Sequence, residues 1–185
     1  MRQNSQMTMP HPLGFLSLES RKPLFFALLL WTLGLFAVFQ VLNAPLTTTA
    51  APEGIVSFEL AGSPSKSAAI LASWDESARL FAAFGLGLDY LFMPSYALTL
   101  SLGTLLAAGR RRGWLNALGA LAGWGALAAA LFDAVENFAL WKILLGALTS
   151  PWPELTAVCA QAKFGLLLLG LLYALAGWLL PKPSG

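Results

Sequence analysis

Residues 23–43 read PLFFALLLWTLGLFAVFQVLN, a run without a single charged side chain, and this stretch decides the class of fold. About 20 apolar residues are enough for a helix to cross a bilayer. Three further apolar stretches follow, at residues 80–108, 114–148 and 153–180. None has the period-two alternation of a membrane β-strand, and helices satisfy their own backbone hydrogen bonds in lipid. The sequence therefore predicts an all-α integral membrane protein whose four transmembrane helices form a bundle.

The composition supports this class and excludes several others. Of the 185 residues, 57% are hydrophobic and 11% are charged, whereas about 25% of the residues of a soluble domain are charged. This shortage of polar side chains excludes soluble enzymes and disordered proteins, and a net charge of +2 is too small to indicate a nucleic-acid partner. A single cysteine, Cys159, excludes an intramolecular disulfide and a cysteine-based metal cage. A single histidine, His11, excludes a histidine-rich zinc or haem site, and the sequence indicates no particular cofactor.

Basic residues predict the orientation of the chain. Arg21 and Lys22 precede the first span, three arginines at residues 110–112 join the second span to the third, and Lys182 follows the fourth. With four spans all of these lie on one side, which the positive-inside rule places in the cytoplasm. We expect a protein of the bacterial plasma membrane with a cytoplasmic N-terminal tail (residues 1–22), an outer loop (residues 44–79) and a cytoplasmic C-terminal tail (residues 181–185). The first span has a longer apolar core than a signal peptide, so we interpret it as an uncleaved anchor.

The segments outside the spans carry weaker patterns. In the outer loop, IVSFEL at residues 55–60 is β-prone, and we expect it to pack on the bundle. Ser63 and Pro64 predict the cap and the first residue of a helix. Residues 1–20 have no periodicity, and we expect a flexible or interfacial leader. After Pro64, apolar residues recur at helical spacing on one face, which predicts an amphipathic helix at the outer surface: Ile70, Leu71, Trp74, Ala78 and Phe81.

Small residues in the third span indicate close packing. Gly119 and Gly123 form a GxxxG pattern, which lets another helix approach the backbone. We favour packing within the bundle over a seam between two copies of the chain.

The polar residues of the spans converge on one level. A helix rises 1.5 Å per residue, so heights can be counted from the cytoplasmic edge of each span. Asp89 and Asp133 lie at about 28 Å, Glu136 at about 33 Å, and Lys163 and Gln40 at about 26 Å. Because the hydrocarbon core is about 30 Å thick, these side chains meet near its outer edge. Closer to the cytoplasm the spans contain no carboxylate or amine, which predicts a cup that is closed below, open outward or sideways, and roofed by the outer loop.

The faces on which these residues lie indicate their roles. Asp133, Glu136 and Asn137 share one stripe of the third span as residues i, i+3 and i+4. Ionisable groups at membrane depth face the bundle interior and pair, so we expect Lys163 to pair with Asp89 or Glu136. The candidates for acid or base catalysis are Asp89, Asp133 and Glu136. The candidates for ligand binding are Asn137, Lys163, Tyr90, Tyr96, Gln40 and Trp141.

Three functions are compatible with such a cluster. The first is a binder of, or an enzyme for, a lipophilic small molecule or a lipid, with its tail in the apolar part of the bundle and its polar end at the cluster. The second is an accessory subunit of a larger membrane complex or a homo-oligomer, in which the cluster is a structural ion-pair network. The third, an ion-coupled transporter, is disfavoured because no titratable groups continue towards the cytoplasm. Oxygen ligands would suit Ca²⁺ or Mg²⁺ rather than zinc, but the spacing matches no known metal motif, and membrane lipids are the expected partners throughout.

Overall fold

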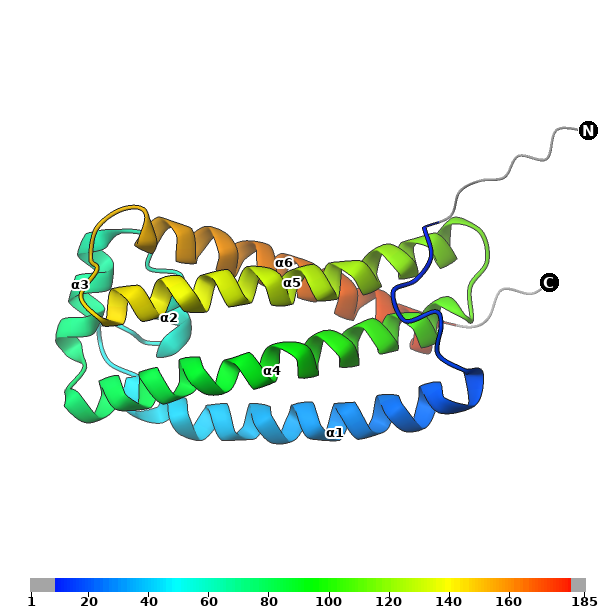
Figure 1. Cartoon of the computed structure of the whole chain (residues 1–185), viewed down its shortest axis with the longest axis horizontal. Helices are drawn as coiled ribbons and strands as arrows, with labels where there is room; N and C mark the ends of the chain where they lie inside the picture. The colour runs from blue at the N-terminus through cyan, green and yellow to red at the C-terminus, as the bar shows by residue number, and fades with distance from the viewer. Residues whose placement is uncertain (1–8, 181–185) are drawn as a thin grey trace, which may run out of the picture.

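The computed structural model describes residues 9–180, and every regular element in that range is helical (Figure 1). The four long helices are α1 (Leu18–Asn43), α4 (Glu76–Ala108), α5 (Trp114–Leu144) and α6 (Trp152–Leu179). Three short helices connect α1 to α4: the 3-10 helix η1 (Ala44–Leu46), α2 (Ile55–Glu59) and α3 (Pro64–Ser73). Each of the four long helices is long and apolar enough to cross a membrane. The prediction of an all-α fold with four such helices is confirmed.

The long helices differ from the predicted spans at their ends. Helix α1 begins at Leu18, before the apolar run, and continues through Arg21 and Lys22. Helix α4 begins at Glu76 because the Asp75 side chain accepts a hydrogen bond of 2.7 Å from the backbone N–H of Ala78 and so caps the helix. Hydropathy marks the edge of an apolar region, whereas capping decides where a helix begins, so helices and apolar runs need not coincide.

Helix α4 occupies the centre of the bundle. It packs against α1, α5 and α6, and α5 and α6 also pack on each other (Figure 1). Helix α1 packs mainly on α4, and within α1 only Leu35 is buried. Near the start of α1, Phe25 meets Trp178 of α6, with 5.9 Å between the ring centroids. Towards the outer loop, α1 and α6 both contribute side chains to the wall of one cavity.

Glycines allow close approach at the end of the bundle opposite the outer loop. A Cβ atom at Gly119 would collide with Ala108 of α4 and Tyr173 of α6. A Cβ atom at Gly123 would collide with the ring of His11. The GxxxG pattern therefore packs within the chain, as predicted.

The segment before α1 folds back onto this end of the bundle (Figure 1, dark blue). The His11 Nε2 atom lies 3.1 Å from the Thr104 hydroxyl, and the Trp124 indole N–H donates to the Pro10 carbonyl at 3.0 Å. The expectation of a flexible leader is wrong for residues 9–17, because the space left by Gly123 holds the His11 ring against α4 and α5. Residues 18–20 of the predicted leader belong to α1. Residues 1–8 of the leader and the C-terminal tail at residues 181–185 lie outside the described residues.

The outer loop is helical throughout its regular parts, so the β-prone interpretation of residues 55–60 is wrong. Residues Ile55–Glu59 form α2, whose Phe58 is fully buried and stacks edge-on against Trp74 at 5.1 Å between ring centroids. A strand would need a neighbouring strand to satisfy its backbone, and none is present among residues 9–180. A helix satisfies these groups locally while placing Phe58 in the core.

The helix predicted beyond Ser63 is present but shorter than expected. Ser63 caps α3 by accepting from the N–H of Lys66, and Pro64 is its first residue, as predicted. The helix stops at Ser73, because Trp74 adopts an extended conformation and donates its indole N–H to the Leu46 carbonyl at 2.8 Å. The expected continuous run to Phe81 is therefore wrong. The loop instead forms its own apolar core on the ends of α4 and α5 and covers the bundle there.

Candidate functional site

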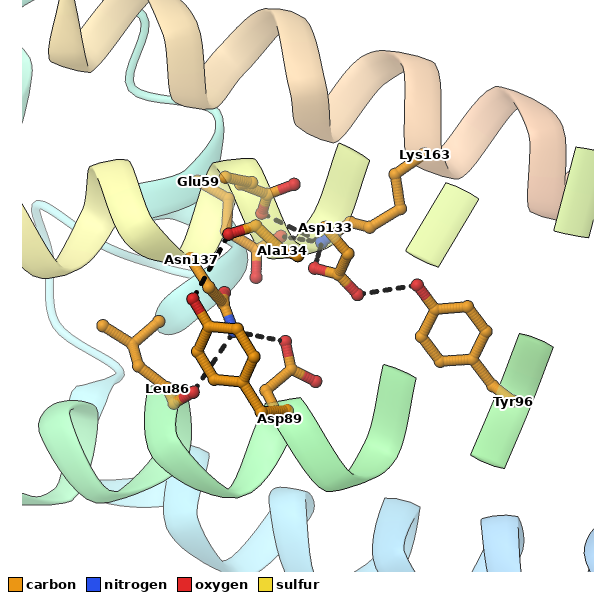
Figure 2. A network of polar contacts seen from close by, with 10 residues as sticks. Glu59, Leu86, Asp89, Tyr96, Asp133, Ala134, Asn137 and Lys163 are labelled. Carbon is orange, nitrogen blue, oxygen red and sulfur yellow. Dashed lines mark hydrogen bonds and ion pairs between the residues drawn. The ribbon is translucent and has the colours of Figure 1, made fainter. Parts of the chain in front are cut away.

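A buried lysine at the centre of the cluster binds three carboxylates. The Lys163 ammonium of α6 lies 2.9 Å from Asp133 Oδ1, 2.9 Å from Glu136 Oε1 and 3.4 Å from Glu59 Oε2 (Figure 2). Asp133 is 2% exposed, Glu136 0% and Lys163 5%. The predicted pairing of Lys163 with Glu136 is confirmed. The alternative pairing with Asp89 is not present, since α5 and α2 supply all three partners.

Helix geometry explains why α5 supplies two of these partners. Asp133, Glu136 and Asn137 are separated by three and four residues and so lie on one face of α5. That face is turned towards α4 and α6, and all three residues are buried. The common level predicted from the helix rise is therefore a real meeting point, at which three of the four long helices (α4, α5 and α6) contribute side chains to one network.

Two neutral donors extend the network towards α4. The Tyr96 hydroxyl donates to Asp133 Oδ2 at 2.8 Å, so both Asp133 oxygens are engaged. The Asn137 amide donates to Asp89 Oδ2 at 2.8 Å and to the Leu86 carbonyl at 3.3 Å (Figure 2). Asp89 is half-buried, and within residues 9–180 it forms no ion pair.

Glu59 is the member of the network that sequence reasoning missed. It comes from α2 in the outer loop and contacts a lysine 104 positions further along the chain. Burial raises the pKa of the Glu59 carboxyl, and the nearby Lys163 ammonium only partly opposes this. One signal was present: an acid in the mostly apolar run IVSFEL requires a partner if that run is buried.

The network borders a cavity of about 400 Å³ between α1, α4, α6 and the outer loop. Its volume lies within the range of sites for drug-sized ligands. Apolar side chains form most of the wall, including the aromatic residues Phe36, Phe39, Phe81, Phe92 and Phe164. The polar part of the wall comprises Gln40, Asn43, Glu59, Asp89, Tyr96, Asp133, Asn137 and Lys163. The cavity therefore has an apolar body and one polar end.

The cavity is open on the side between α1 and α6. Phe36 of α1 is 52% exposed and Phe164 of α6 is 38% exposed, although both line the cavity. Gln40 is also exposed at this edge. By contrast, the residues deepest in the network, Asp133 and Glu136, are sealed from the surface. The edge between Phe36 and Phe164 is therefore a route by which a molecule could reach the polar end of the cavity.

Two predicted ligand-binding residues lie apart from this cavity. Tyr90 is exposed on α4, and its hydroxyl donates to the Ala134 carbonyl at 3.3 Å. Trp141 is 48% exposed on α5 and packs beside Phe138, with 6.2 Å between the ring centroids. Neither lines the cavity. Trp141 lies four residues after Asn137 and Tyr90 directly follows Asp89, but both side chains turn to the outside of the bundle.

In the network, each acid accepts a hydrogen bond from a lysine, tyrosine or asparagine side chain. Among residues 9–180 no group of three or more His, Cys, Asp or Glu side chains has the arrangement of a metal site. The Lys163 ammonium occupies the point between Asp133, Glu136 and Glu59 at which a bound cation would sit. Among the carboxyl groups of residues 9–180 that line the cavity, Asp89 is the one that forms no ion pair. No family model, curated protein or solved structure matches the chain.

Proposed function

We propose that this chain is an integral membrane protein that binds an amphiphile, either a lipophilic small molecule or a single lipid, in the cavity beside Lys163. The observation that carries the proposal is the form of the cavity: about 400 Å³ of mostly apolar wall that ends at a buried polar network. An amphiphile matches both parts, because its tail is removed from water and its polar end finds hydrogen-bonding partners.

The exposed surface of the four long helices supports a membrane location. Large apolar side chains cover the outside of the bundle, as is required for contact with lipid. The basic residues Arg21, Lys22 and Arg110–Arg112 gather at the end opposite the outer loop, which favours cytoplasmic termini and an outer loop on the far side. A bacterial plasma membrane is consistent with this orientation. In that setting α3 lies at the outer surface, with Ile70 and Leu71 on the bundle and Lys66 in water.

The open side of the cavity favours entry from the bilayer. The edge between α1 and α6 is formed by Phe36 and Phe164, which would face lipid rather than water in this orientation. A lipophilic ligand concentrated in the outer leaflet could slide between the two helices without crossing the aqueous phase. The outer loop, which is packed through Phe58 and Trp74, closes the route from the water side.

A pair of glycine variants tests the proposal with little risk to the fold. Gly85 lines the cavity, Gly87 does not, and a Cβ atom at either position meets no atom within 4 Å. We expect Gly85→Leu to fill the cavity and remove a bound ligand, while Gly87→Leu keeps it. Leucine is also a better helix former than glycine, so neither change should disturb α4.

Native mass spectrometry of protein purified in a mild detergent, followed by extraction and identification of the bound molecule, gives the readout. The expected result is a bound mass in the wild type and Gly87→Leu and none in Gly85→Leu. If the wild type carries no such mass, or if all three proteins retain it equally, the binding proposal is wrong. The network is then a structural ion-pair cluster, as in an accessory subunit of a membrane complex.

A further inference from the structure

We propose that the cavity selects amphiphiles whose polar end is a protonated amine, and that the Asp89 carboxyl binds that amine. This inference rests on the proposed function and adds the chemical class of the ligand. Its evidence is that the polar end of the cavity has more acids than cations, and that Lys163 and Tyr96 already donate their hydrogen bonds to acids of the protein.

Lys163 has no donor left for an anionic ligand. An ammonium group has three N–H bonds, and those of Lys163 are directed at Asp133, Glu136 and Glu59. The Tyr96 hydroxyl is likewise donated to Asp133. A carboxylate or phosphate headgroup entering the cavity would have to break these contacts. It would also approach a cluster that contains more acids than cations.

Asp89 presents the opposite situation, because it is an acceptor with capacity to spare. Its Oδ2 atom accepts one hydrogen bond from Asn137, and within the described part of the chain no Lys, Arg or His nitrogen forms an ion pair with it. A carboxylate in an apolar cavity is costly unless a cation or a donor accompanies it. A ligand ammonium would supply both the charge and the N–H groups that the protein itself does not.

The walls near Asp89 also suit a cation with an apolar tail. Phe39 and Phe92 line the cavity with their ring centroids 5.2 Å apart, and Phe92 lies 5.3 Å from the ring of Tyr96. Aromatic faces attract ammonium groups and also accommodate the first methylene groups of the tail. The same side chains offer nothing to an anion.

Three probes with ten carbon atoms each separate the headgroups: decylamine, decanol and decanoate. Binding of each to the wild-type protein in lipid nanodiscs at pH 7.4 is measured by isothermal titration calorimetry against empty nanodiscs. We expect decylamine to bind at least about tenfold more tightly than decanol, as a charge-assisted hydrogen bond implies, and decanoate to show no binding above the empty nanodiscs.

Asp89→Asn is the decisive variant, because it removes the charge but keeps the size of the side chain and an oxygen for the Asn137 amide. We expect it to lose the preference for decylamine while retaining the binding of decanol. Glu53→Gln is the matched control, since Glu53 is an exposed acid of the outer loop that does not line the cavity. It should preserve the preference for the amine.

The possible outcomes separate two questions: which class of ligand the cavity prefers, and whether it binds a ligand at all. If decylamine and decanol bind the wild type equally, or Asp89→Asn keeps the preference, the inference about the amine is overturned. Provided that Gly85→Leu still abolishes binding of all probes, the proposed function survives that result. If decanoate binds best, the charge argument is wrong. If no probe binds, both proposals fall.

Discussion

Substituting Lys163 with methionine is expected to lower the free energy of unfolding by about 4 kcal/mol at pH 7 and by about 1 kcal/mol at pH 5. Methionine replaces most of the lysine side chain by volume, so the packing of α6 is largely kept. What is lost is the positive charge that, among residues 9–180, forms the ion pairs with Asp133, Glu136 and Glu59. All three acids are buried, and water cannot replace the ammonium without opening the network.

The magnitude follows from the charge that must be removed. Without Lys163, one further acid has to take up a proton if the charge of the cluster is to stay unchanged. Protonating an acid with an ordinary aqueous pKa of about 4.3 costs about 4 kcal/mol at pH 7 and about 1 kcal/mol at pH 5. The value at neutral pH agrees with the 3–5 kcal/mol that is typical when one partner of a buried ion pair is removed.

Thermal unfolding of detergent-purified protein at both pH values measures the effect. A change of 1 kcal/mol shifts the Tm of a chain of this size by about 2–4 °C, so we expect a fall of about 8–16 °C at pH 7 and of about 2–4 °C at pH 5. Lys66→Met is the matched control, because Lys66 is exposed on α3 and should leave the Tm unchanged.

Glu59→Gln provides the opposite test of the same reasoning. Burial raises the pKa of the Glu59 carboxyl in the folded protein. Glu59 therefore contributes most to the free energy of unfolding when its carboxyl is neutral, and this contribution declines as the pH rises above the ordinary pKa of a glutamate. A neutral amide of the same size should therefore leave the Tm at pH 7 unchanged or raise it.

For the Lys163→Met variant, a Tm equal to that of the wild type at pH 7, or an equal fall at both pH values, would refute the electrostatic argument.

Two further predictions concern the N-terminal segment and the topology. Partial burial, reinforced by Arg21, lowers the pKa of His11 from its usual 6.5 to about 4. Docking of residues 9–17 on the bundle should thus weaken as the pH falls below about 6.5 and stop weakening below about 4, and hydrogen exchange of this segment would detect the change. The His11→Gln variant should lose this pH dependence. If its exchange profile has the same pH dependence as that of the wild type, the assignment to His11 is wrong. For topology, in a Cys159→Ala background a membrane-impermeant maleimide applied to intact cells should label Ser65→Cys and spare Gly109→Cys, and the reverse labelling would invert the proposed orientation.

The four long helices and the level of their polar residues could be predicted without coordinates. Each depends on local properties of the chain: hydrophobic length, helical rise and the spacing of Asp133, Glu136 and Asn137 on one face. The pairing of Lys163 with Glu136 also followed, because a buried amine and a buried acid at one height have few other partners.

Local patterns failed where the chain folds back on itself. The apolar run at residues 55–60 resembles a strand in composition, but it forms α2 because no other strand is present among residues 9–180 to pair with it. His11 looked like part of a structureless leader, since nothing in its neighbours reveals that Gly123 leaves space for its ring. Tyr90 directly follows Asp89 and Trp141 lies four residues after Asn137, yet both side chains are directed away from the cavity.

The cavity and its fourth acid depend on contacts that join distant parts of the chain. Glu59 reaches Lys163 because the outer loop has a core of its own, built around Phe58 and Trp74, which holds α2 against α5 and α6. The opening beside Phe164 exists because α1 packs mainly on α4 and leaves the side facing α6 uncovered. Hydropathy and helical spacing describe a single segment, whereas a cavity is the space that remains after all segments have packed, so only the tertiary structure could reveal it.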